Sequence, residues 1–531
     1  MNLARLLVER AEESPDVEAI IESAHGRDHV TTFAQLARRG QQFAALFESD
    51  GIRPGDTALV FVPMSATLYE ILLGLWAVGA SASFLDPSAG GPAFERACEM
   101  LVPAAFVGTP RSQMLRLSSS SLRRIPLAYS TGLALPTTHS LHRARSLEPR
   151  GAMVDVEPDS PALVTFTSGS TGTPKAAVRT HSFLQAQYEV LQNHLRLKPG
   201  QRDLATLPVF ALADLASGAT MIVPEADLRA PGSIDATRVL RQIGRLGVSR
   251  ITASPAFFER LVDECEQRGQ IMASVTTLHT GGGPVFPRLL DRLGEAAPNA
   301  HISAVFGSTE AEPISELHAS DLDTDTRQAV ASGAGLPAGH PIAEIDLRIV
   351  RATWGEPLGS LTQPLFDAMT SEPGEPGEIV VSGPHVLKGY LAGAGDAENK
   401  FDVEGTRWHR TGDAGYLDTT GRLWLLGRTG ERILDERGVV YPFSIEAMAL
   451  QDPTVARAAL VSAENRRVLA VEWVTPGNAT ADAMDALAIE GVDLVVSVDH
   501  IPVDSRHNSK VNYPALRVLL SQDVSGRRPT R

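Results

Sequence analysis

The sequence predicts an α/β protein with largely parallel sheets. Helix-like and strand-like segments alternate along most of the 531 residues, with helices of about 10–15 residues between short strands, which is typical of βαβ units. No internal repeat of about 20–50 residues is visible, and this excludes most solenoids and propellers. The length is that of three or four domain-sized units.

The first third of the chain shows this alternation clearly. Residues 33–47 carry apolar side chains at helical spacing, residues 57–62 read as a buried strand, and an apolar helix is expected over residues 65–78. Residues 104–108 are the next expected strand. The stretch 109–150 is richer in serine, arginine and proline, so we expect a loop-rich surface there.

The alternation of helices and strands returns in the middle of the chain and then gives way to short strands and turns. The expected elements are a helix over 234–246, a strand over 248–253 and a helix over 257–268, followed by short strands at 378–382, 415–418, 421–425, 458–461 and 468–471. The change to short strands and turns begins near residue 376, and a small terminal unit is expected from about Glu431.

Composition excludes several classes of protein. Hydrophobic residues make up 43% and charged residues 21%, as in ordinary globular proteins. The net charge of −15 disfavours a nucleic-acid partner. Cys98 and Cys265 show no metal-ligand spacing and are expected to be buried. The longest apolar run, residues 71–85, is too short to span a membrane, and residues 1–10 resemble an amphipathic helix rather than a signal peptide, so we expect a cytoplasmic protein.

The strongest local signal is the string TFTSGSTGTPK at residues 165–175. A strand over 162–166 leads into a loop of hydroxyls and glycines that ends on Lys175. Small residues let backbone N–H groups approach an anion, hydroxyls donate further hydrogen bonds and the lysine adds a cation, so the loop suits phosphates. Its spacing differs from that of a Walker loop.

This string closely resembles the phosphate loop of the adenylate-forming superfamily, which includes acyl-CoA synthetases, firefly luciferase and peptide-synthetase adenylation domains. Further elements follow in that family's order. They are HTGGGP at 279–284, FGSTE at 306–310, WHRTGD at 408–413, GR at 427–428 and RHNSK at 506–510. The resemblance covers the chain to about residue 520.

The resemblance implies ATP and Mg²⁺ as cofactors, a small carboxylic acid as substrate, and a role for each matching residue. The expected phosphate-binding residues are Thr167, Ser168, Gly169, Ser170, Thr171, Gly172 and Lys175; those on the adenine side are Gly281, Gly282, Gly283, Phe306, Gly307 and Ser308. Asp413 and Arg428 would contact the ribose. Thr309 and Glu310 would hold the metal, and the expected catalytic residues are Lys510, Thr309, Glu310 and His507.

The family also implies a domain organisation. Residues 1–428 would form a large N-terminal domain of two α/β subdomains plus a small distorted β-barrel. Residues 429–531 would form a small, mobile α+β C-terminal domain that carries Lys510 and closes over the large domain. Because Lys510 is needed for the first half-reaction, this domain would have to rotate when a different second half-reaction follows.

Three departures from the common pattern argue against CoA as the acyl acceptor. Residues 207–212 lack the histidine that many acyl-CoA synthetases carry there. The hinge position is Gly430, which permits rotation without adding a charge. The following loop, residues 435–438, places Asp435 and Glu436 where a polyanionic thiol cofactor would pass.

Residues 210–214, 307–314 and 503–510 resemble the β-lactone synthetase branch of this superfamily, found in bacterial olefin biosynthesis. That branch implies a 3-hydroxy acid whose own hydroxyl attacks the acyl adenylate, so that no external nucleophile is needed. Acyl transfer to CoA, a carrier protein or an amine, or an unusual natural-product activation, remains the alternative.

The acyl pocket is expected from residues 209–215, 254–258 and 281–286. Phe210, Phe257 and Phe258 would then line an alkyl tunnel or be ordinary core aromatics. Asp214 would face the acyl pocket or be a core aspartate. The sequence does not decide chain length, stereochemistry or oligomeric state.

Overall fold

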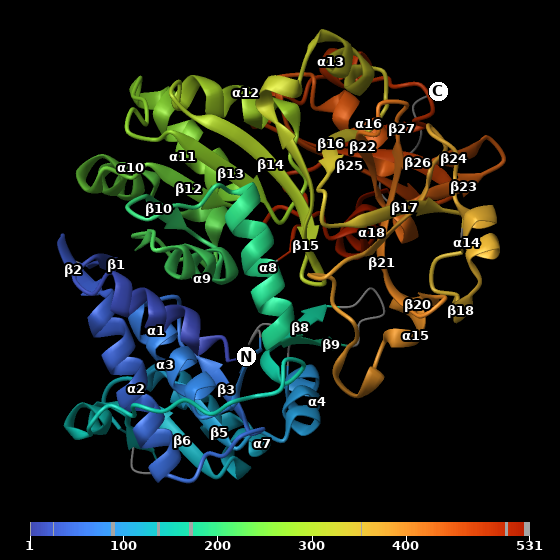
Figure 1. Cartoon of the computed structure of the whole chain (residues 1–531). Coiled ribbons are helices and arrows are strands. Elements are labelled where there is room, and N and C mark those ends of the chain that lie inside the picture. Colours follow the sequence, from blue (N-terminus) through green and yellow to red (C-terminus); the bar gives the residue numbers. More distant parts are fainter. Residues whose placement is uncertain are drawn as a thin grey trace.

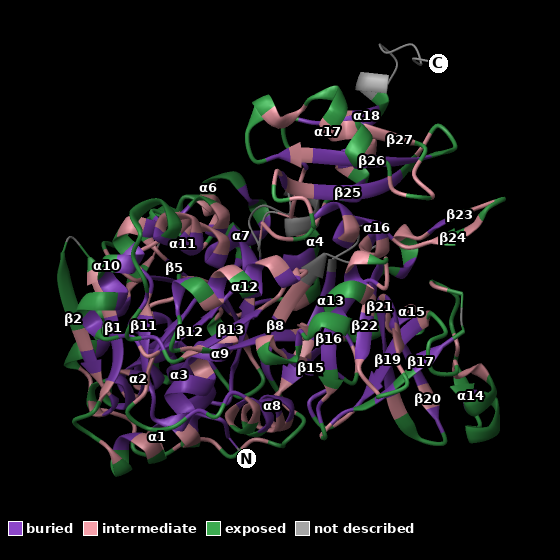
Figure 2. Ribbon diagram, turned by 90° about the horizontal axis from the view of Figure 1, so that it is seen from above, coloured by how far each residue is buried: buried purple, intermediate pink, exposed green. Residues whose placement is uncertain are grey.

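The computed structural model describes residues 2–24, 26–85, 91–134, 138–168, 174–351, 353–504 and 508–524. These residues form a mixed α/β fold with two large sheets and a C-terminal domain, which confirms the predicted fold class (Figure 1). Figure 2 shows that the strands of both large sheets are mostly buried, whereas exposed residues concentrate on helix faces and connections.

The N-terminal unit contains a seven-stranded sheet in the order β7-β6-β5-β3-β4-β8-β9, parallel except for β9. Its strands are β3 (Thr57–Phe61), β4 (Ser81–Phe84), β5 (Ala105–Gly108), β6 (Leu127–Ser130), β7 (His139–Ser140), β8 (Pro161–Ser168) and β9 (Pro174–Thr180). Helices α1 (Ala4–Glu13), α2 (Phe33–Ser49), α3 (Ala66–Ala77) and α4 (Gly91–Leu101) accompany it. Helices α2 and α3 approach closely because Gly40 of α2 leaves room for Leu73 of α3. A Cβ added at Gly40 would lie 2.2 Å from the Leu73 Cδ2.

The expectation of a loop-rich surface over residues 109–150 is wrong. The stretch contains α5 (Pro110–Gln113), α6 (Leu115–Ser118), α7 (Ser120–Arg124) and strands β6 and β7. Tyr129 on β6 is fully buried, with its ring centroid 5.3 Å from that of Phe47. A polar average hides such short elements, because at most three residues in each are buried.

The second sheet begins with β2-β1-β11-β10-β12-β13-β14-β15, in which the neighbouring strands from β1 to β14 are parallel. Its strands are β1 (Glu18–Ala24), β2 (Arg27–Thr32), β10 (Arg202–Ala205), β11 (Thr220–Val223), β12 (Arg250–Ala253), β13 (Thr277–Gly281), β14 (His301–Ser308) and β15 (Ala311–His318). Helices α8 (His181–His194), α9 (Pro208–Ser217), α10 (Ala236–Leu246), α11 (Pro255–Arg268) and α12 (Pro287–Ala296) accompany it. The carboxyl ends of β12, β13 and β14 share one edge, where ligands bind in open α/β sheets.

Antiparallel strands continue this sheet from β15 and correspond to the small barrel that the family resemblance implied. They are β16 (Leu336–Pro341), β17 (Asp346–Val350), β19 (Gly377–Ser382), β20 (Lys400–Val403), β21 (Thr406–Leu417) and β22 (Leu423–Arg428), with the short β18 (Ser360–Leu361) paired to β20. Helix α13 (Thr324–Ala331) precedes β16 in sequence, and α14 (Gln363–Met369) and α15 (Asp396–Asn399) lie between the later strands. The register of β21 and β22 places Asp413 opposite Arg428.

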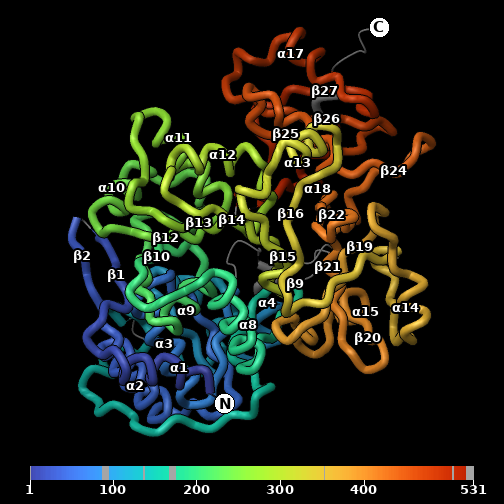
Figure 3. The backbone as a smooth tube through the Cα atoms, turned by 45° about the horizontal axis from the view of Figure 1, so that its top comes forward, coloured from blue at the N-terminus to red at the C-terminus, as the bar shows by residue number. Residues whose placement is uncertain are grey.

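The C-terminal domain, red in Figure 3, contains the sheet β25-β26-β27 and a small hairpin, β23-β24. Its elements are β23 (Ile433–Asp435), β24 (Gly438–Val440), α16 (Pro442–Ala449), β25 (Val455–Ala463), β26 (Arg466–Trp473), α17 (Ala481–Ala486), β27 (Leu494–Ser497) and α18 (Tyr513–Val524). The boundary between residues 428 and 429 and the mobility of this domain remain predictions. Within the described ranges, no helix combines the length and apolar character needed to cross a membrane.

Glu446 links three elements of the C-terminal domain. From α16 it accepts hydrogen bonds from the backbone N–H of Leu460 at 3.0 Å and the Tyr513 hydroxyl at 2.9 Å. Burial raises the pKa of Glu446 to about 7. The folded state therefore holds a proton that the unfolded state releases near pH 4.5, so stability falls as pH rises from about 4.5 to about 7.

We expect Glu446→Gln to remove this part of the pH dependence, because a neutral amide has no ionisation cost. At pH 8 the carboxyl's ionisation opposes folding by on the order of 3 kcal/mol, while below pH 5 this contribution is absent. Calorimetry of both proteins at pH 5 and pH 8 measures the difference. An equal pH dependence in the two proteins would contradict the assignment.

Candidate functional site

The hairpin of β8 and β9 carries most of the predicted phosphate-binding residues at its connection. Thr167 and Ser168 end β8, and Thr167 pairs with Lys175 on β9. The remaining predicted loop residues, Gly169, Ser170, Thr171 and Gly172, lie outside the described residues. The Lys175 side chain is buried and passes Gly395, where an added Cβ would lie 2.9 Å from its Cδ.

Glu310 lies in the tight connection between β14 and β15, at the sheet edge. Its backbone N–H donates to the Ser308 hydroxyl at 3.2 Å, and its carbonyl accepts from the Leu387 N–H at 2.7 Å. Its carboxylate accepts a hydrogen bond from the Tyr390 hydroxyl at 2.7 Å. These contacts fix both the backbone and the side chain of this residue.

Tyr390 joins the predicted phosphate lysine to the predicted metal carboxylate. Its ring is buried, with the Lys175 Nζ 5.8 Å and the Lys400 Nζ 5.5 Å from the ring centroid, distances at which an ammonium is attracted to an aromatic face. An isolated bridge pairs Tyr390 with Ala177 of β9. Tyr390 therefore contacts both predicted site residues through one side chain.

Sequence reasoning missed Tyr390 and Lys400. Lys400 is buried and donates to the Leu387 carbonyl, and burial lowers the pKa of its ammonium to about 7. Tyr390 is 80 positions from Glu310, so no local pattern joins them. The only local hint of a functional residue here was the string Lys388-Gly389-Tyr390, a polar loop that ends on an aromatic residue.

The charges of the site influence one another. Burial opposes ionisation of Glu310, but His409, the Tyr390 hydroxyl and Lys400 outweigh it and hold the pKa of Glu310 below its ordinary value. Burial lowers the pKa of Lys175, while Glu398 and Glu310 oppose that effect. Glu310 is therefore ionised at neutral pH, as a ligand for a hard cation must be.

The donor types at this edge fit Mg²⁺. Thr309, which precedes Glu310 in the sequence, carries a hydroxyl, and its backbone carbonyl accepts a hydrogen bond from the Arg179 guanidinium at 3.1 Å. Mg²⁺ prefers oxygen ligands and usually keeps waters and substrate phosphates alongside one or two carboxylates. In the part of the chain that the structure describes, no group of three or more His, Cys, Asp or Glu side chains could hold a metal by itself.

Glycines on β13 and β14 keep the predicted adenine side narrow. An added Cβ at Gly281 would lie 2.5 Å from the Val305 carbonyl oxygen, and one at Gly307 would lie 2.9 Å from the Ala311 carbonyl oxygen. Gly282 has φ +81°, which favours glycine. Phe306 is half-buried at the end of β14, so part of its ring is accessible to a ligand.

Asp413 and Arg428, predicted to contact ribose, form an ion pair across β21 and β22. The Arg428 Nη1 lies 3.0 Å from the Asp413 Oδ1 and also donates to the Thr411 carbonyl at 3.1 Å. The Asp413 carboxylate raises the pKa of Arg428, and Glu310 contributes to this shift. The pair is therefore electrostatically linked to the carboxylate of the metal site.

Lys510 lies in a segment that we call the lysine hairpin, of which the structure describes residues 503–504 and 508–511, with a bridge between Val503 and Val511. The Asp504 carboxylate accepts from the Lys510 N–H at 2.8 Å and the Ser509 N–H at 3.1 Å. His507 lies outside the described residues. The hairpin lies against the glycine segment: a Cβ added at Gly283 would lie 2.5 Å from the Ser509 Cβ.

The predicted acyl pocket is only partly recognisable. Phe257 and Phe258 are fully buried in the core beside the second sheet, in an edge-on pair with ring centroids 6.4 Å apart. Asp214 is also buried, and burial together with neighbouring Asp203 raises its pKa well above the ordinary value. These residues therefore lie where ordinary core residues lie.

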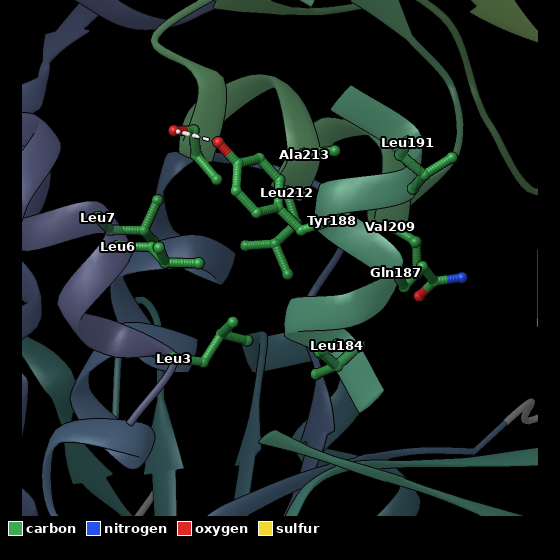
Figure 4. A pocket seen from close by; sticks show the side chains of 11 residues that line it. Leu3, Leu6, Leu7, Leu184, Gln187, Tyr188, Leu191, Val209, Leu212 and Ala213 are labelled. Atoms are coloured by element: carbon green, nitrogen blue, oxygen red, sulfur yellow. Dashed lines mark hydrogen bonds between the residues drawn. The ribbon is translucent and has the colours of Figure 1, made fainter. Parts of the chain in front are cut away.

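A small apolar cavity lies between α1, α8 and α9 (Figure 4). It is lined by Leu3, Leu6, Leu7, Leu184, Gln187, Tyr188, Leu191, Val209, Leu212, Ala213 and Ala216. Its volume is about 20 Å³, room for about one water molecule. It cannot hold an alkyl chain in this form of the protein.

The loop after the hinge was expected to present the negative charges of Asp435 and Glu436, but Asp435 is paired with arginines. Both oxygens of Asp435 accept hydrogen bonds from the Arg467 guanidinium, at 2.6 and 2.7 Å. Arg437 lies 3.3 Å from the same carboxylate. The charge of Asp435 is thereby balanced, which weakens the argument that this loop would repel a polyanionic cofactor.

Comparison with known proteins gives one family. The model of a family described as AMP-binding enzyme matches residues 7–391. A protein named olefin beta-lactone synthetase from Stenotrophomonas maltophilia is 30% identical over 99% of both chains. One of the same name from Xanthomonas campestris pv. campestris is 30% identical over 98% of both chains.

Solved structures share the fold. The amide bond synthetase McbA from Marinactinospora thermotolerans aligns with a TM-score of 0.79 over 98% of this chain and 99% of its own, at 20% identity. O-succinylbenzoate coenzyme A synthetase (MenE) from Bacillus subtilis, in complex with ATP and magnesium ion, aligns with a TM-score of 0.75 over 96% and 98%, at 21% identity. At these identities the likeness establishes the fold alone.

Proposed function

Because this chain belongs to the AMP-binding enzyme family and is an ATP-dependent adenylate-forming ligase, we propose that it activates a 3-hydroxy acid as acyl-AMP and closes it to a β-lactone. The observation that carries the proposal is the 30% identity to an olefin beta-lactone synthetase across 99% of both chains. The family by itself gives the coarser function, ATP-dependent activation of a small carboxylic acid.

In the first half-reaction a carboxylate oxygen bonds to the α-phosphorus of ATP, and the bond from that phosphorus to pyrophosphate breaks. Lys510 would stabilise the charge that develops between the carboxylate and the α-phosphate. Lys175 and the loop before it would hold the β- and γ-phosphates. Asp413 and Arg428 would orient the ribose, so that the reacting atoms stay in line.

Glu310 and Thr309 would hold Mg²⁺, which when bound screens the negative charge of the phosphoryl oxygens. Glu310 suits this role because its pKa lies below the ordinary value and its carboxylate is oriented by Tyr390. Its fixed backbone keeps the neighbouring Thr309 hydroxyl at the same sheet edge.

In the second half-reaction the 3-hydroxyl oxygen attacks the acyl carbon, the bond to AMP breaks, and AMP leaves. The hydroxyl proton needs a base, and His507, three residues before Lys510 in the sequence, is the proposed acceptor. Proximity of the hydroxyl and the acyl carbon within one substrate offsets the strain of the four-membered ring.

Acyl transfer to CoA is the second candidate, favoured by the pairing of Asp435 with Arg467, which weakens one objection to CoA near the hinge. The two candidates differ in what must be added. A β-lactone forms from the adenylate alone, whereas an acyl-CoA needs free thiol.

The decisive experiment is mass spectrometry of the protein incubated with ATP, Mg²⁺ and a medium-chain 2-alkyl-3-hydroxy acid, with and without CoA. The expected product is lighter than the acid by one water, or is the alkene left after loss of carbon dioxide, and forms with AMP in both mixtures. The matched acid without its 3-hydroxyl should release pyrophosphate and give neither product. An acyl-CoA in the mixture with CoA, with neither the lactone nor the alkene in either mixture, would contradict lactone closure.

We expect Tyr390→Phe to reduce ATP–pyrophosphate exchange by roughly 10- to 100-fold, the value of one hydrogen bond to a charged group. Loss of the hydroxyl also raises the pKa of Glu310, so the acid limb of the activity profile should move to higher pH. The ring and its two lysine contacts remain. Tyr416→Phe, which loses a bond to the Ala334 carbonyl at 3.1 Å, is the matched control, and equal loss in both variants would refute a specific role for Tyr390.

A further inference from the structure

The lysine hairpin contacts the N-terminal domain at three points on the edge of the second sheet. The Gly232 N–H donates to the Asn508 Oδ1 at 3.4 Å, and the Ala256 N–H donates to the Ser509 hydroxyl at 3.3 Å. The third contact is the close approach of Ser509 to Gly283. All three lie within two residues of Lys510.

We propose that these contacts are a latch that holds the C-terminal domain in the orientation for adenylate formation, with Asn508 and Arg457 as its positioning residues. The inference rests on the proposed function, because it assigns this orientation to the first half-reaction. Neither residue touches the reacting atoms; both act through the placement of Lys510.

Asn508 is suited to the corner of the hairpin. Its φ is +51°, a conformation that asparagine tolerates better than most residues. Its amide group donates to the Asp504 carbonyl at 3.0 Å, and its side-chain oxygen accepts from Gly232. One side chain therefore shapes the hairpin and also docks it on the other domain.

Arg457 on β25 connects the hairpin to helix α11 of the N-terminal domain. Its Nη1 donates to the Asn508 carbonyl at 3.2 Å, and its Nη2 lies 3.7 Å from the Glu259 carboxylate. A second arginine crosses in the opposite direction: Arg288 on α12 donates to the Val455 carbonyl at 2.9 Å. The domain orientation is thus held by side chains from both sides.

The chemistry of these contacts suits a reversible latch. They are polar, the hydrogen bonds to Asn508 and Ser509 are long, and Arg457 and Glu259 are only partly buried. Such pairs contribute little individually, so a few of them favour one orientation without preventing release. Glycines at 232 and 283 let the hairpin approach the backbone, since neither has a side chain that would hold it away.

A disulfide between residues 232 and 508 tests whether this orientation exists in solution. A Cβ at Gly232 would lie 3.4 Å from that of Asn508, close to the spacing that disulfides need. Cys98 and Cys265 are buried and should not compete. We expect the full-length Gly232→Cys/Asn508→Cys protein to cross-link readily with diamide. A Gly244→Cys/Asn508→Cys pair should not, because a Cβ at 244 has no atom within 4 Å.

Activity then tests the role of the orientation. The reduced pair lacks the Asn508 side chain and should show ATP–pyrophosphate exchange about tenfold below the unmodified protein, as expected when the competent orientation is tenfold less populated. Formation of the disulfide should restore exchange. Arg457→Ala in the Cys pair should slow cross-linking about tenfold, and in the native sequence it should reduce exchange more than the release of AMP from pre-formed acyl adenylate.

Each negative result has a separate meaning. Equal cross-linking of the two Cys pairs, or cross-linking unaffected by Arg457→Ala, would overturn the latch without reference to any substrate. Loss of exchange on oxidation would show that this orientation is not the one for adenylation. If none of the acids supplied supports ATP–pyrophosphate exchange by the unmodified protein, the proposed function fails. The cross-linking result still decides whether the contact forms.

Discussion

Replacement of Lys510 by alanine is expected to reduce ATP–pyrophosphate exchange by roughly 10²–10³-fold or more, which amounts to loss of adenylate formation. The reason is electrostatic, since a cation aimed at the transferring phosphoryl group acts mainly on the transition state. The loss should therefore appear in kcat, with little change in the apparent affinity for ATP.

The fold should survive this substitution. The Lys510 side chain is exposed, and the contacts that shape the hairpin use its backbone N–H and carbonyl, which bond to Asp504. Lys198→Ala, at another exposed lysine, is the matched control. Lys510→Arg should stay impaired, because a planar guanidinium does not reproduce a compact ammonium. Normal exchange in Lys510→Ala would remove the lysine from the mechanism.

Replacement of Arg410 by methionine is expected to lower the free energy of unfolding by about 3–5 kcal/mol, the typical cost of leaving one member of a buried ion pair uncompensated. Arg410 and Glu378 are both fully buried, and the Arg410 Nε lies 3.0 Å from the Glu378 carboxylate. The guanidinium also stacks over Trp354, with its carbon 5.4 Å from the ring centroid.

The loss should be larger at pH 8 than at pH 5. Burial already raises the pKa of Glu378, and without Arg410 it should rise further, so the folded variant retains a proton that the unfolded chain releases. The Arg410→Met/Glu378→Met double variant should recover most of the stability, because an apolar pair leaves no buried charge. Urea unfolding at both pH values measures all three proteins, and similar stability of the single and double variants would contradict this explanation.

The same substitution should also weaken nucleotide binding. Arg410 lies on β21, three residues before Asp413, so displacement of this strand moves the carboxylate predicted to hold the ribose. Arg410 belongs to the motif at residues 408–413, but the sequence alone did not predict a role for its side chain. Burial against Glu378, on a strand 32 positions away, supplies that reason.

Local patterns were sufficient to predict much of this protein. Residues 33–47, 65–78 and 257–268 became helices within a few residues of their expected limits, because apolar side chains at helical spacing bury one face. The motif at 306–310 was expected to carry the metal ligands, and Thr309 and Glu310 do lie at the carboxyl edge of β14. In such cases neighbours in the sequence are also neighbours in space.

Patterns failed where burial depends on distant partners. Strand β6 lies in a stretch of polar composition and is defined by pairing with β5 and contact with Phe47. Asp435 reads as a free carboxylate, but Arg467 lies against it from the next sheet. Phe257 and Phe258 could be assigned to a tunnel or to the core until their packing was seen.

The sequence by itself determined the fold class, the family and the residues predicted to bind the nucleotide, because short motifs and hydrophobic spacing are written along the chain. Only the tertiary structure decided that Tyr390 joins Lys175 to Glu310, that Arg410 compensates Glu378, and that Asn508 docks the lysine hairpin on Gly232. These contacts join residues tens to hundreds of positions apart, and their energies depend on distance and burial, which no local pattern specifies.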